Sequence, residues 1–341
     1  MDLIKIEDVF DGHVHLRMGH LLQSVVNHTA SHCSAALIMP NTDPPISTAN
    51  DARQYRDTIK RAVEYQNQPF APLMTIKVTD RTTPEMIRNA KKAGVSAGKT
   101  YPVSVTTGSQ DGVSDFRKLF PVFSAMQANN MPLSMHGELP GSPWWTSEVD
   151  FLPILDMISR KFPELRIVME HVSRTESVEF VKSRPNVWGT ITAHHMYYTE
   201  KNVYARDRET IINPHRLCKP VCGNVEDKKA LIAAAISGNR KFFYGSDSAP
   251  HWESNKLGEK PAFGIFAAPT ALQIVVETFV NQGASDKLQG FLSDFGLGFY
   301  RAHLSENKVA RFFRTEWKVP ERYGNVVPLA AGRTLEWQIQ N

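Results

Sequence analysis

The sequence is poor in cysteine and has only short apolar runs. Its three cysteines in 341 residues, Cys33, Cys218 and Cys222, are too few and odd in number for a disulfide framework. Cys218 and Cys222 lack the second pair usual for a structural zinc site, so we expect reduced thiols. The longest apolar stretch, Leu231 to Ile236, is far shorter than the ~20 residues that span a bilayer.

Charge of one sign is not concentrated anywhere in the chain. The first twenty residues carry several charged side chains, which excludes the apolar core of a secretory signal, and we expect a soluble cytoplasmic protein. The net charge is only +4, and no basic run is interleaved with aromatic residues, so we expect no nucleic-acid partner. A mild positive balance would still help to attract anionic substrates.

Short β-rich runs alternate with helical patterns, which is typical of βα units around a parallel sheet. Eight runs qualify as strands, the number that a closed (β/α)8 barrel requires. They are residues 4–10, 33–39, 73–78, 95–99, 133–136, 166–171, 187–193 and 241–245. We expect a single domain over residues 1–341, with a TIM-like barrel from about 4 to 284 and a C-terminal extension from about 285 to 341.

Helix boundaries and long loops can also be read from the sequence. Thr83-Pro84 predicts a helix start that Gly94 would end, Asp115 can cap a helix over residues 116–129, and Asn224 can cap the Ala-rich segment after it. Residues 100–113 and 194–223 form long connections after predicted strands. Loops of that length are uncommon unless they are functional.

Possible metal ligands recur where the predicted strands end. His13 and His15 are spaced i, i+2, so both point to the same side of an extended strand and can bind one metal together. Further candidates follow other strands one at a time: Lys99, His136, His171 and Asp247. In a barrel of parallel strands these ends meet on one face, where active sites lie. The set is suited to a hydrolase with two metal ions.

Seven motifs in order strengthen this interpretation. They are HxHxR at 13–17, Met39-Pro-Asn41, Gly98-Lys-Thr-Tyr-Pro102, His136-Gly-Glu138, Glu170-His171, Thr192-Ala-His-His195 and Gly245-Ser-Asp-Ser-Ala-Pro-His251. Together they resemble the dihydroorotases of the short, stand-alone type, in the amidohydrolase superfamily. The resemblance extends from about residue 9 to about residue 300.

We expect His13, His15 and Asp247 to bind one metal, and His136 and His171 to bind the other. The resemblance implies that Lys99 is carboxylated and bridges the two ions. Zinc suits the histidine-rich set, although manganese or cobalt could replace it. Two divalent ions would activate a water molecule, and Asp247 is the expected catalytic group that carries its proton to the leaving nitrogen.

The resemblance also implies how a substrate would be held. Arg17, Asn41 and His251 match the residues that bind the carboxylate of dihydroorotate, and backbone groups near Lys219 and Phe263 match positions that contact its ring. Thr106 and Thr107 match a threonine pair on a loop that closes over the substrate. With Gly108 and Gly112 in it, the loop 100–113 is predicted to be a mobile lid.

Other histidines are expected to play indirect roles or none. His194, His195 and His215 are interpreted as structural or supporting, as are Tyr101 and Glu138, and no chemistry is assigned to His20, His28, His32 and His303. The predicted function is the reversible hydrolysis of L-dihydroorotate to N-carbamoyl-L-aspartate in pyrimidine synthesis. The resemblance alone implies a homodimer. The alternatives are a hydantoinase or dihydropyrimidinase-like cyclic amidase, and an inactive scaffold protein resembling a dihydroorotase.

Overall fold

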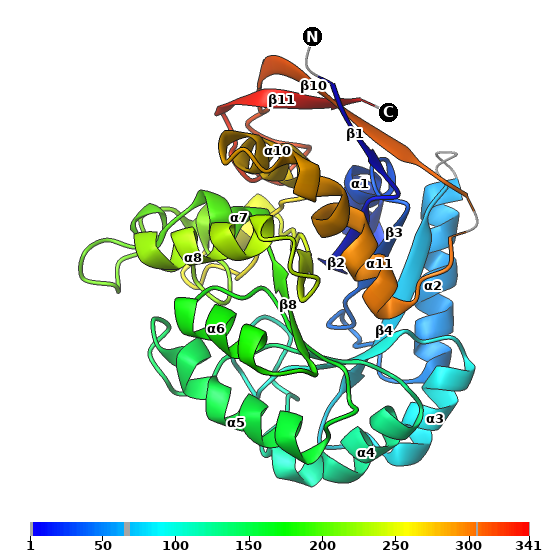
Figure 1. Ribbon diagram of the computed structural model, residues 1–341. Helices are drawn as coiled ribbons and strands as arrows, with labels where there is room; N and C mark the ends of the chain where they lie inside the picture. The colour runs from blue at the N-terminus through cyan, green and yellow to red at the C-terminus, as the bar shows by residue number, and fades with distance from the viewer. Residues whose placement is uncertain (1–2, 65–68, 305, 341) are drawn as a thin grey trace.

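A closed barrel of eight parallel strands organises the molecule, as predicted (Figure 1). The computed structural model describes residues 3–64, 69–304 and 306–340. The strands pair in chain order from β2 to β9. They are β2 (Phe10–Val14), β3 (Ala35–Ile38), β4 (Ala71–Val78), β5 (Ala97–Thr100), β6 (Leu133–Met135), β7 (Ile167–Met169), β8 (Val187–Ile191) and β9 (Phe242–Tyr244).

Helices cover the outside of this barrel. They are α1 (Gly19–Ala30), α2 (Ala49–Glu64), α3 (Pro84–Lys92), α4 (Phe120–Ala128), α5 (Ser147–Lys161), α6 (Thr175–Ser183), α7 (Ala193–Tyr197), α8 (Val225–Ile236), α9 (Glu253–Lys256), α10 (Ala271–Asn281) and α11 (Phe295–Tyr300). The predicted caps are confirmed at Thr83, which accepts a hydrogen bond from the Met86 amide, and at Asn224, which forms a capping box with Asp227. None of the described helices is both long and apolar enough to cross a bilayer.

The prediction that residues 4–10 form the first barrel strand is wrong. Asp8 has a φ of 51°, which breaks the run into β1 (Leu3–Glu7) and β2. β1 leaves the barrel and pairs antiparallel with β10 (Val309–Lys318), which also pairs with β11 (Thr334–Gln340). This three-stranded sheet joins both ends of the chain at the top of Figure 1. A division between a barrel and an extension near residue 285 therefore stays a prediction.

The segment after residue 288 closes the end of the barrel where the strands begin. The predicted helix 288–300 is a π-helical turn (Gly290–Asp294) followed directly by α11. Phe299 and Tyr300 of α11 pack with Phe10 and Phe243, whose side chains fill the barrel interior. The polar residues of the candidate site therefore lie at the opposite end of the barrel, where the strands end.

We predict that Gly296→Ala in α11 destabilises the protein. An added Cβ would lie 2.4 Å from Cδ1 of Phe10, so the helix or the ring must move. Overpacking of this kind typically costs ~1–3 kcal/mol. Urea denaturation, monitored by fluorescence, would measure this loss in the free energy of unfolding.

The matched control is Gly298→Ala in the same helix, where a Cβ would meet no atom within 4 Å. It should be neutral or stabilising by up to about 1 kcal/mol, because Ala favours a helix more than Gly does. Equal stability of the two variants would contradict the packing argument.

Candidate metal centre

The first group of predicted ligands meets where the barrel closes. Nε2 of His13 lies 3.2 Å from Nε2 of His15, and both nitrogens lie within 3.3 Å of Oδ1 of Asp247. All three side chains are buried. These short separations between three donor atoms are those expected around one shared cation.

Backbone contacts across the closing strands hold this group together. The amide of His15 donates to the carbonyl of Ser248, and the amide of Asp247 donates to the carbonyl of His13. The Asp11 carboxylate accepts hydrogen bonds from the amides of His13 and Ser246, at 3.1 and 2.8 Å. The positions of His13, His15 and Asp247 therefore follow directly from the joining of β2 to the end of β9.

The second group lies beside the first. The rings of His136 and His171 are 4.8 Å apart, and the His13 ring is 5.1 Å from that of His171. Glu138 lies 2.7 Å from Nε2 of His136, which leaves Nδ1 of that ring available to a metal. In the same way, Glu170 lies 2.8 Å from Nδ1 of His13, which leaves Nε2 of that ring available to a metal. Carboxylates that take the second ring nitrogen commonly orient metal-binding histidines.

Lys99 is fully buried in β5, with no hydrogen-bond partner for its Nζ among the described residues. Burial lowers the pKa of its amine to about 8, although Glu170 and Asp247 oppose the shift. Nδ1 of His171 is also buried without a partner in the described part of the chain. Because unpaired buried polar groups are costly, these atoms fit a site that holds divalent ions.

The protonation states suit metal binding as well. Burial lowers the pKa of His15 to about 3 and that of His171 well below its ordinary value, so both rings are neutral near pH 7. Burial alone would raise the pKa of Asp247, but the hydrogen bond with His15 and the nearby histidines hold it well below its usual range. Neutral imidazoles and an ionised carboxylate are the forms that bind metals.

Three site residues have a left-handed backbone. Arg17, His171 and Asp247 have φ values of 60°, 42° and 41°. Such conformations cost a non-glycine residue ~1–3 kcal/mol each and persist where the surrounding structure imposes them. Here they direct side chains from the ends of strands into the site.

Two neighbouring cavities contain the predicted substrate residues. An inner cavity of about 20 Å³ is lined by five of the six predicted ligands and by Thr106, Lys219 and Phe263. An outer cavity of about 630 Å³ is lined by His251 and Lys77, among others. Arg17, Asn41 and Thr107 line both cavities. The structure thus brings together every residue predicted for the site, with Lys99 buried behind the lining.

The Arg17 guanidinium is held at the boundary between the cavities. Its Nε donates to the carbonyl of Pro250 at 3.0 Å, and one terminal nitrogen lies 3.0 Å from Nε2 of His251. Burial, followed by the nearby Arg17 charge, lowers the pKa of His251 to about 3, so this imidazole is neutral. The remaining N–H groups of Arg17 are available to an anionic ligand.

The predicted lid lies closed over the inner cavity. Asn41 donates to the carbonyl of Thr107 at 3.2 Å, and the Thr107 hydroxyl donates to the carbonyl of Phe263 at 3.4 Å. Lys77 holds the far side of the loop, because its Nζ donates to the carbonyl of Gly108 at 2.8 Å and pairs with Asp111. A space of 20 Å³ holds about one water molecule, so a larger ligand requires the loop to move.

Sequence reasoning missed the supporting roles of two of these residues. Glu170 was noted only as part of a motif, but it contacts His13 and accepts hydrogen bonds from Ser134 and Thr190. Its position directly before His171 in the sequence could have indicated that it supports the site. Lys77 was not singled out at all, although a lysine at the end of a buried strand next to an active face could have been noticed.

Comparisons with known proteins agree with this geometry. The Amidohydrolase family model matches residues 44–273. A probable dihydroorotase of Schizosaccharomyces pombe is 40% identical over 341 residues, covering 98% of both chains. A mitochondrial dihydroorotase of Arabidopsis thaliana is 39% identical over 96% of this chain and 88% of its own length.

Solved structures agree too. A Saccharomyces cerevisiae dihydroorotase in complex with 5-fluoroorotic acid superposes with a TM-score of 0.91 at 33% identity, covering 100% of this chain and 99% of that one. An L-hydantoinase (dihydropyrimidinase) of Arthrobacter aurescens, with a TM-score of 0.80 at 15% identity over 98% of this chain and 82% of its own, shows a common fold alone.

The fold and the convergent ligand set define an amidohydrolase, a class that is generally metal-dependent. Within that class, the chain belongs to the dihydroorotase family.

We predict that Lys77→Met impairs lid closure without removing metal. A hydrogen bond to a charged group is worth ~1.5–3 kcal/mol, so kcat/KM should fall roughly 10–100-fold if closure depends on it. Hydrogen exchange should also become faster in residues 104–112. Metal content, measured by elemental analysis, should not change.

Lys92→Met at an exposed helix position is the control and should behave like the parent protein. Unaltered turnover and unaltered exchange in Lys77→Met would show that Lys77 does not anchor the loop.

Proposed function

We propose that the chain catalyses the reversible hydrolysis of L-dihydroorotate to N-carbamoyl-L-aspartate, the ring-closure step of pyrimidine synthesis. One observation carries the proposal: the Arg17, Asn41 and His251 side chains line cavities that adjoin the His13, His15 and Asp247 group. A carboxylate bound by Arg17 would place the rest of the ring towards those ligands. Dihydroorotate has such a ring carboxylate beside its scissile amide.

His13, His15 and Asp247 would hold one divalent ion, and His136 and His171 the other, with zinc the best match for these donors. The neutral Lys99 amine, favoured by its lowered pKa, can react with carbon dioxide and release a proton to give an anionic carbamate, which would be a ligand for the ions. When bound, the ions would polarise the scissile carbonyl and lower the pKa of a water molecule.

Asp247 is the proposed proton carrier. Its ionised carboxylate can accept a proton from the attacking water and deliver that proton to the leaving nitrogen as the C–N bond breaks. Its contacts with His13 and His15 leave a carboxylate oxygen for this role. General acid–base transfer of this kind typically contributes ~10²–10⁴-fold in rate.

The remaining residues would position the substrate and exclude water. Arg17 can present parallel N–H groups to the ring carboxylate, with Asn41 and His251 beside it. Backbone groups near Lys219 and Phe263 would contact the ring. Thr106 and Thr107 would close the lid, and loss of water from the closed site would strengthen its electrostatic interactions.

A cyclic amidase of the hydantoinase type is the second candidate, since it would share the metal ligands. Its substrates need no ring carboxylate, so it gives no reason for the Arg17 group. An inactive scaffold is disfavoured because every predicted ligand position is filled. A homodimer and a cytoplasmic location remain predictions, and the Arabidopsis relative is named as mitochondrial.

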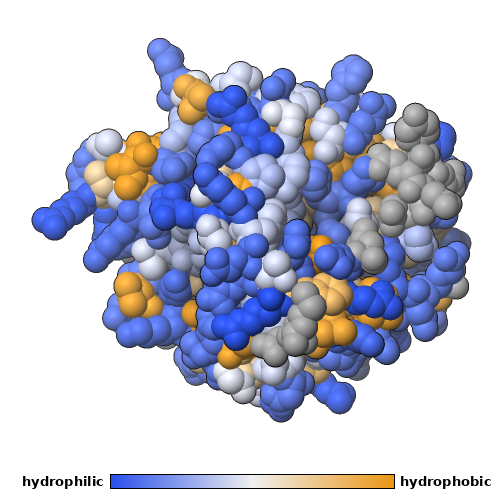
Figure 2. Space-filling model, turned by 90° about the horizontal axis from the view of Figure 1, so that it is seen from above, coloured by the Kyte–Doolittle hydropathy of each residue, from blue (hydrophilic) through white to orange (hydrophobic). Residues whose placement is uncertain are grey.

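On the face seen in Figure 2, hydrophobic side chains form small separate groups among hydrophilic ones, which gives no support to a particular dimer surface.

Lys99→Ala is predicted to lose the bridge between the ions. Turnover should fall by at least ~10³-fold, a barrier increase of about 4 kcal/mol, and the bound metal should decrease. Small carboxylic acids should restore part of the activity by replacing the carbamate. Intact-mass measurement under native conditions should find one added CO2 in the parent protein only. Two tightly held ions and normal turnover in the variant would contradict the bridge.

Arg17→Lys is predicted to raise KM for dihydroorotate roughly 10–100-fold with metal content unchanged, because a point charge cannot reproduce the planar fork. Steady-state assays with dihydroorotate and with hydantoin would measure the effect. Arg117→Lys at an exposed position serves as the control. If the parent protein hydrolyses hydantoin but not dihydroorotate, the proposed function is wrong and the cyclic amidase takes its place.

A further inference from the structure

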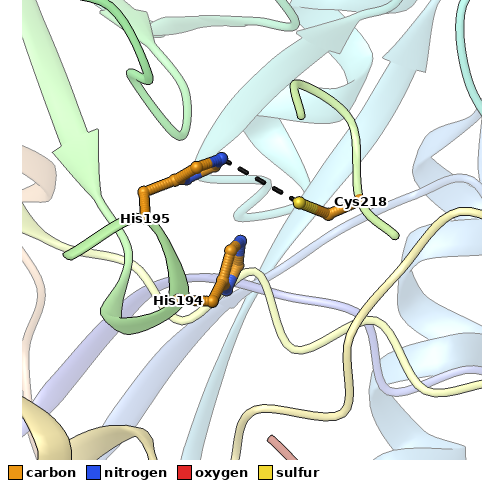
Figure 3. A group of neighbouring side chains, drawn as sticks. All are labelled: His194, His195 and Cys218. Atoms are coloured by element: carbon orange, nitrogen blue, oxygen red, sulfur yellow. Dashed lines mark hydrogen bonds between the residues drawn. The ribbon is translucent and has the colours of Figure 1, made fainter. Parts of the chain in front are cut away.

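A second buried group of metal-binding side chains lies outside the lining of both cavities. His194 and His195 begin α7, directly after β8, and Cys218 lies in the loop that precedes α8. One donor atom from each of the three lies within 4.8 Å of the others. Figure 3 shows the two rings and the thiol converging from these separate segments. All three residues are at most 1% exposed.

His194 is the unexplained member of this group. Both of its ring nitrogens are buried, and neither makes a hydrogen bond with any part of the chain that the structure describes. A neutral imidazole has one N–H and one bare nitrogen, and leaving both unpaired in the interior is costly. The Cys218 thiol also interacts with this ring, but a thiol is only a weak donor and acceptor and does not satisfy a buried imidazole. A buried histidine of this kind needs a partner.

His195 is held by hydrogen bonds at both ring nitrogens. Its Nδ1 lies 2.8 Å from the hydroxyl of Thr192, and its Nε2 lies 4.0 Å from Sγ of Cys218 and 3.0 Å from the carbonyl of Pro220. The Pro220 carbonyl can only accept, so Nε2–H donates to it, and the Thr192 hydroxyl, which accepts from the His195 amide, donates to Nδ1. An ion at Nε2 would displace that proton to Nδ1, which would then donate to the Thr192 hydroxyl, a usual support of a metal-bound histidine.

Cys222 lies next to the group, and its thiol donates to the carbonyl of His194 at 3.7 Å. The adjacent Cys222 and burial raise the pKa of Cys218 to about 12, so without a cation the Cys218 sulfur carries a proton. A divalent ion would displace the Cys218 proton to water as the sulfur–metal bond forms.

We propose that His194, His195 and Cys218 bind a single divalent ion of the zinc class, with Cys222 available as the fourth ligand. Thiolate and imidazole donors select zinc or cobalt over magnesium or calcium. Tetrahedral zinc, with bonds of ~2.0–2.3 Å, places its donors about 3.5 Å apart, so the side chains must close by about 1 Å. The sequence argued against zinc here because a second cysteine pair is missing, but the fold supplies two histidines.

This proposed site is separate from the candidate hydrolytic site. A bound ion there would stabilise the loop that forms one side of the inner cavity. None of the six ligands predicted there contains sulfur. Cys218 is bonded to Lys219, whose side chain lines the inner cavity, and the Leu217 carbonyl accepts a hydrogen bond from the Gly264 amide. An ion at Cys218 would therefore hold the loop that forms one side of the substrate cavity.

Cobalt(II) is the probe, because a thiolate bonded to it gives a near-ultraviolet charge-transfer band that histidine and carboxylate ligands cannot give. Reduced full-length protein, stripped of metal and reloaded with cobalt, should show this band and bind three ions per chain. Cys218→Ser combined with Cys222→Ser should abolish the band and reduce the count to two. His194→Gln should weaken binding of the third ion at least tenfold.

Cys33→Ser is the matched control: it removes a buried cysteine outside the group, so the band and the count should stay as in the parent protein. His13→Asn separates the proposal from the hydrolytic function, because it should lose hydrolytic metal and turnover but keep the sulfur band.

Zinc-edge X-ray absorption of the unmutated protein supplies a test that needs no variant. Sulfur scattering at about 2.3 Å is expected, whereas a shell of only nitrogen and oxygen would overturn the proposal. Absence of the cobalt band in the reduced parent protein, or its persistence when Cys218 and Cys222 are both replaced by serine, would overturn it too.

Discussion

Closure of the barrel between β2 and the end of β9 is the constraint on which the candidate site depends. His13 and Asp247 are separated by more than two hundred residues, and they meet because the Asp247 amide donates to the His13 carbonyl across this junction. Buried Asp11 reinforces the junction by accepting from amides on both sides. The same hydrogen bonds that complete the sheet therefore bring the first group of candidate ligands together.

A rigid support allows the site to keep costly features. Positive φ values at His171 and Asp247 and the unpaired amine of Lys99 each oppose folding in the absence of a bound cation. The opposite end of the barrel is filled by aromatic packing between α11 and the strands, which offers no chemistry but much buried apolar area. The stabilising apolar packing thus lies at one end of the barrel strands, and the candidate site lies at the other end.

Much of this arrangement could be predicted from the sequence, because apolar runs mark the strands and polar residues follow them. Seven of the eight predicted strands overlap the barrel strands by three or more residues, whereas the eighth, 4–10, overlaps β2 only at Phe10. The eighth failed at Asp8, since no local pattern shows that β1 pairs with a strand some three hundred residues later. The contact of Lys77 with Gly108 and the meeting of His194 with Cys218 were missed for the same reason. Such pairs are decided by tertiary placement, which spacing along the chain does not encode.

The closed lid bears on how a substrate would be chosen. The inner cavity has room for about one water molecule while Thr107 is bonded to Phe263, whereas the outer cavity is large and presents Arg17 and His251. In the proposed function, an anion would therefore meet the Arg17 group first, and the Thr107 contact would have to break before a ligand could enter the inner cavity. The proposed metal chemistry would act on many cyclic amides. The enzyme would therefore select its substrate by the carboxylate that binds the Arg17 group and not by the amide that is hydrolysed.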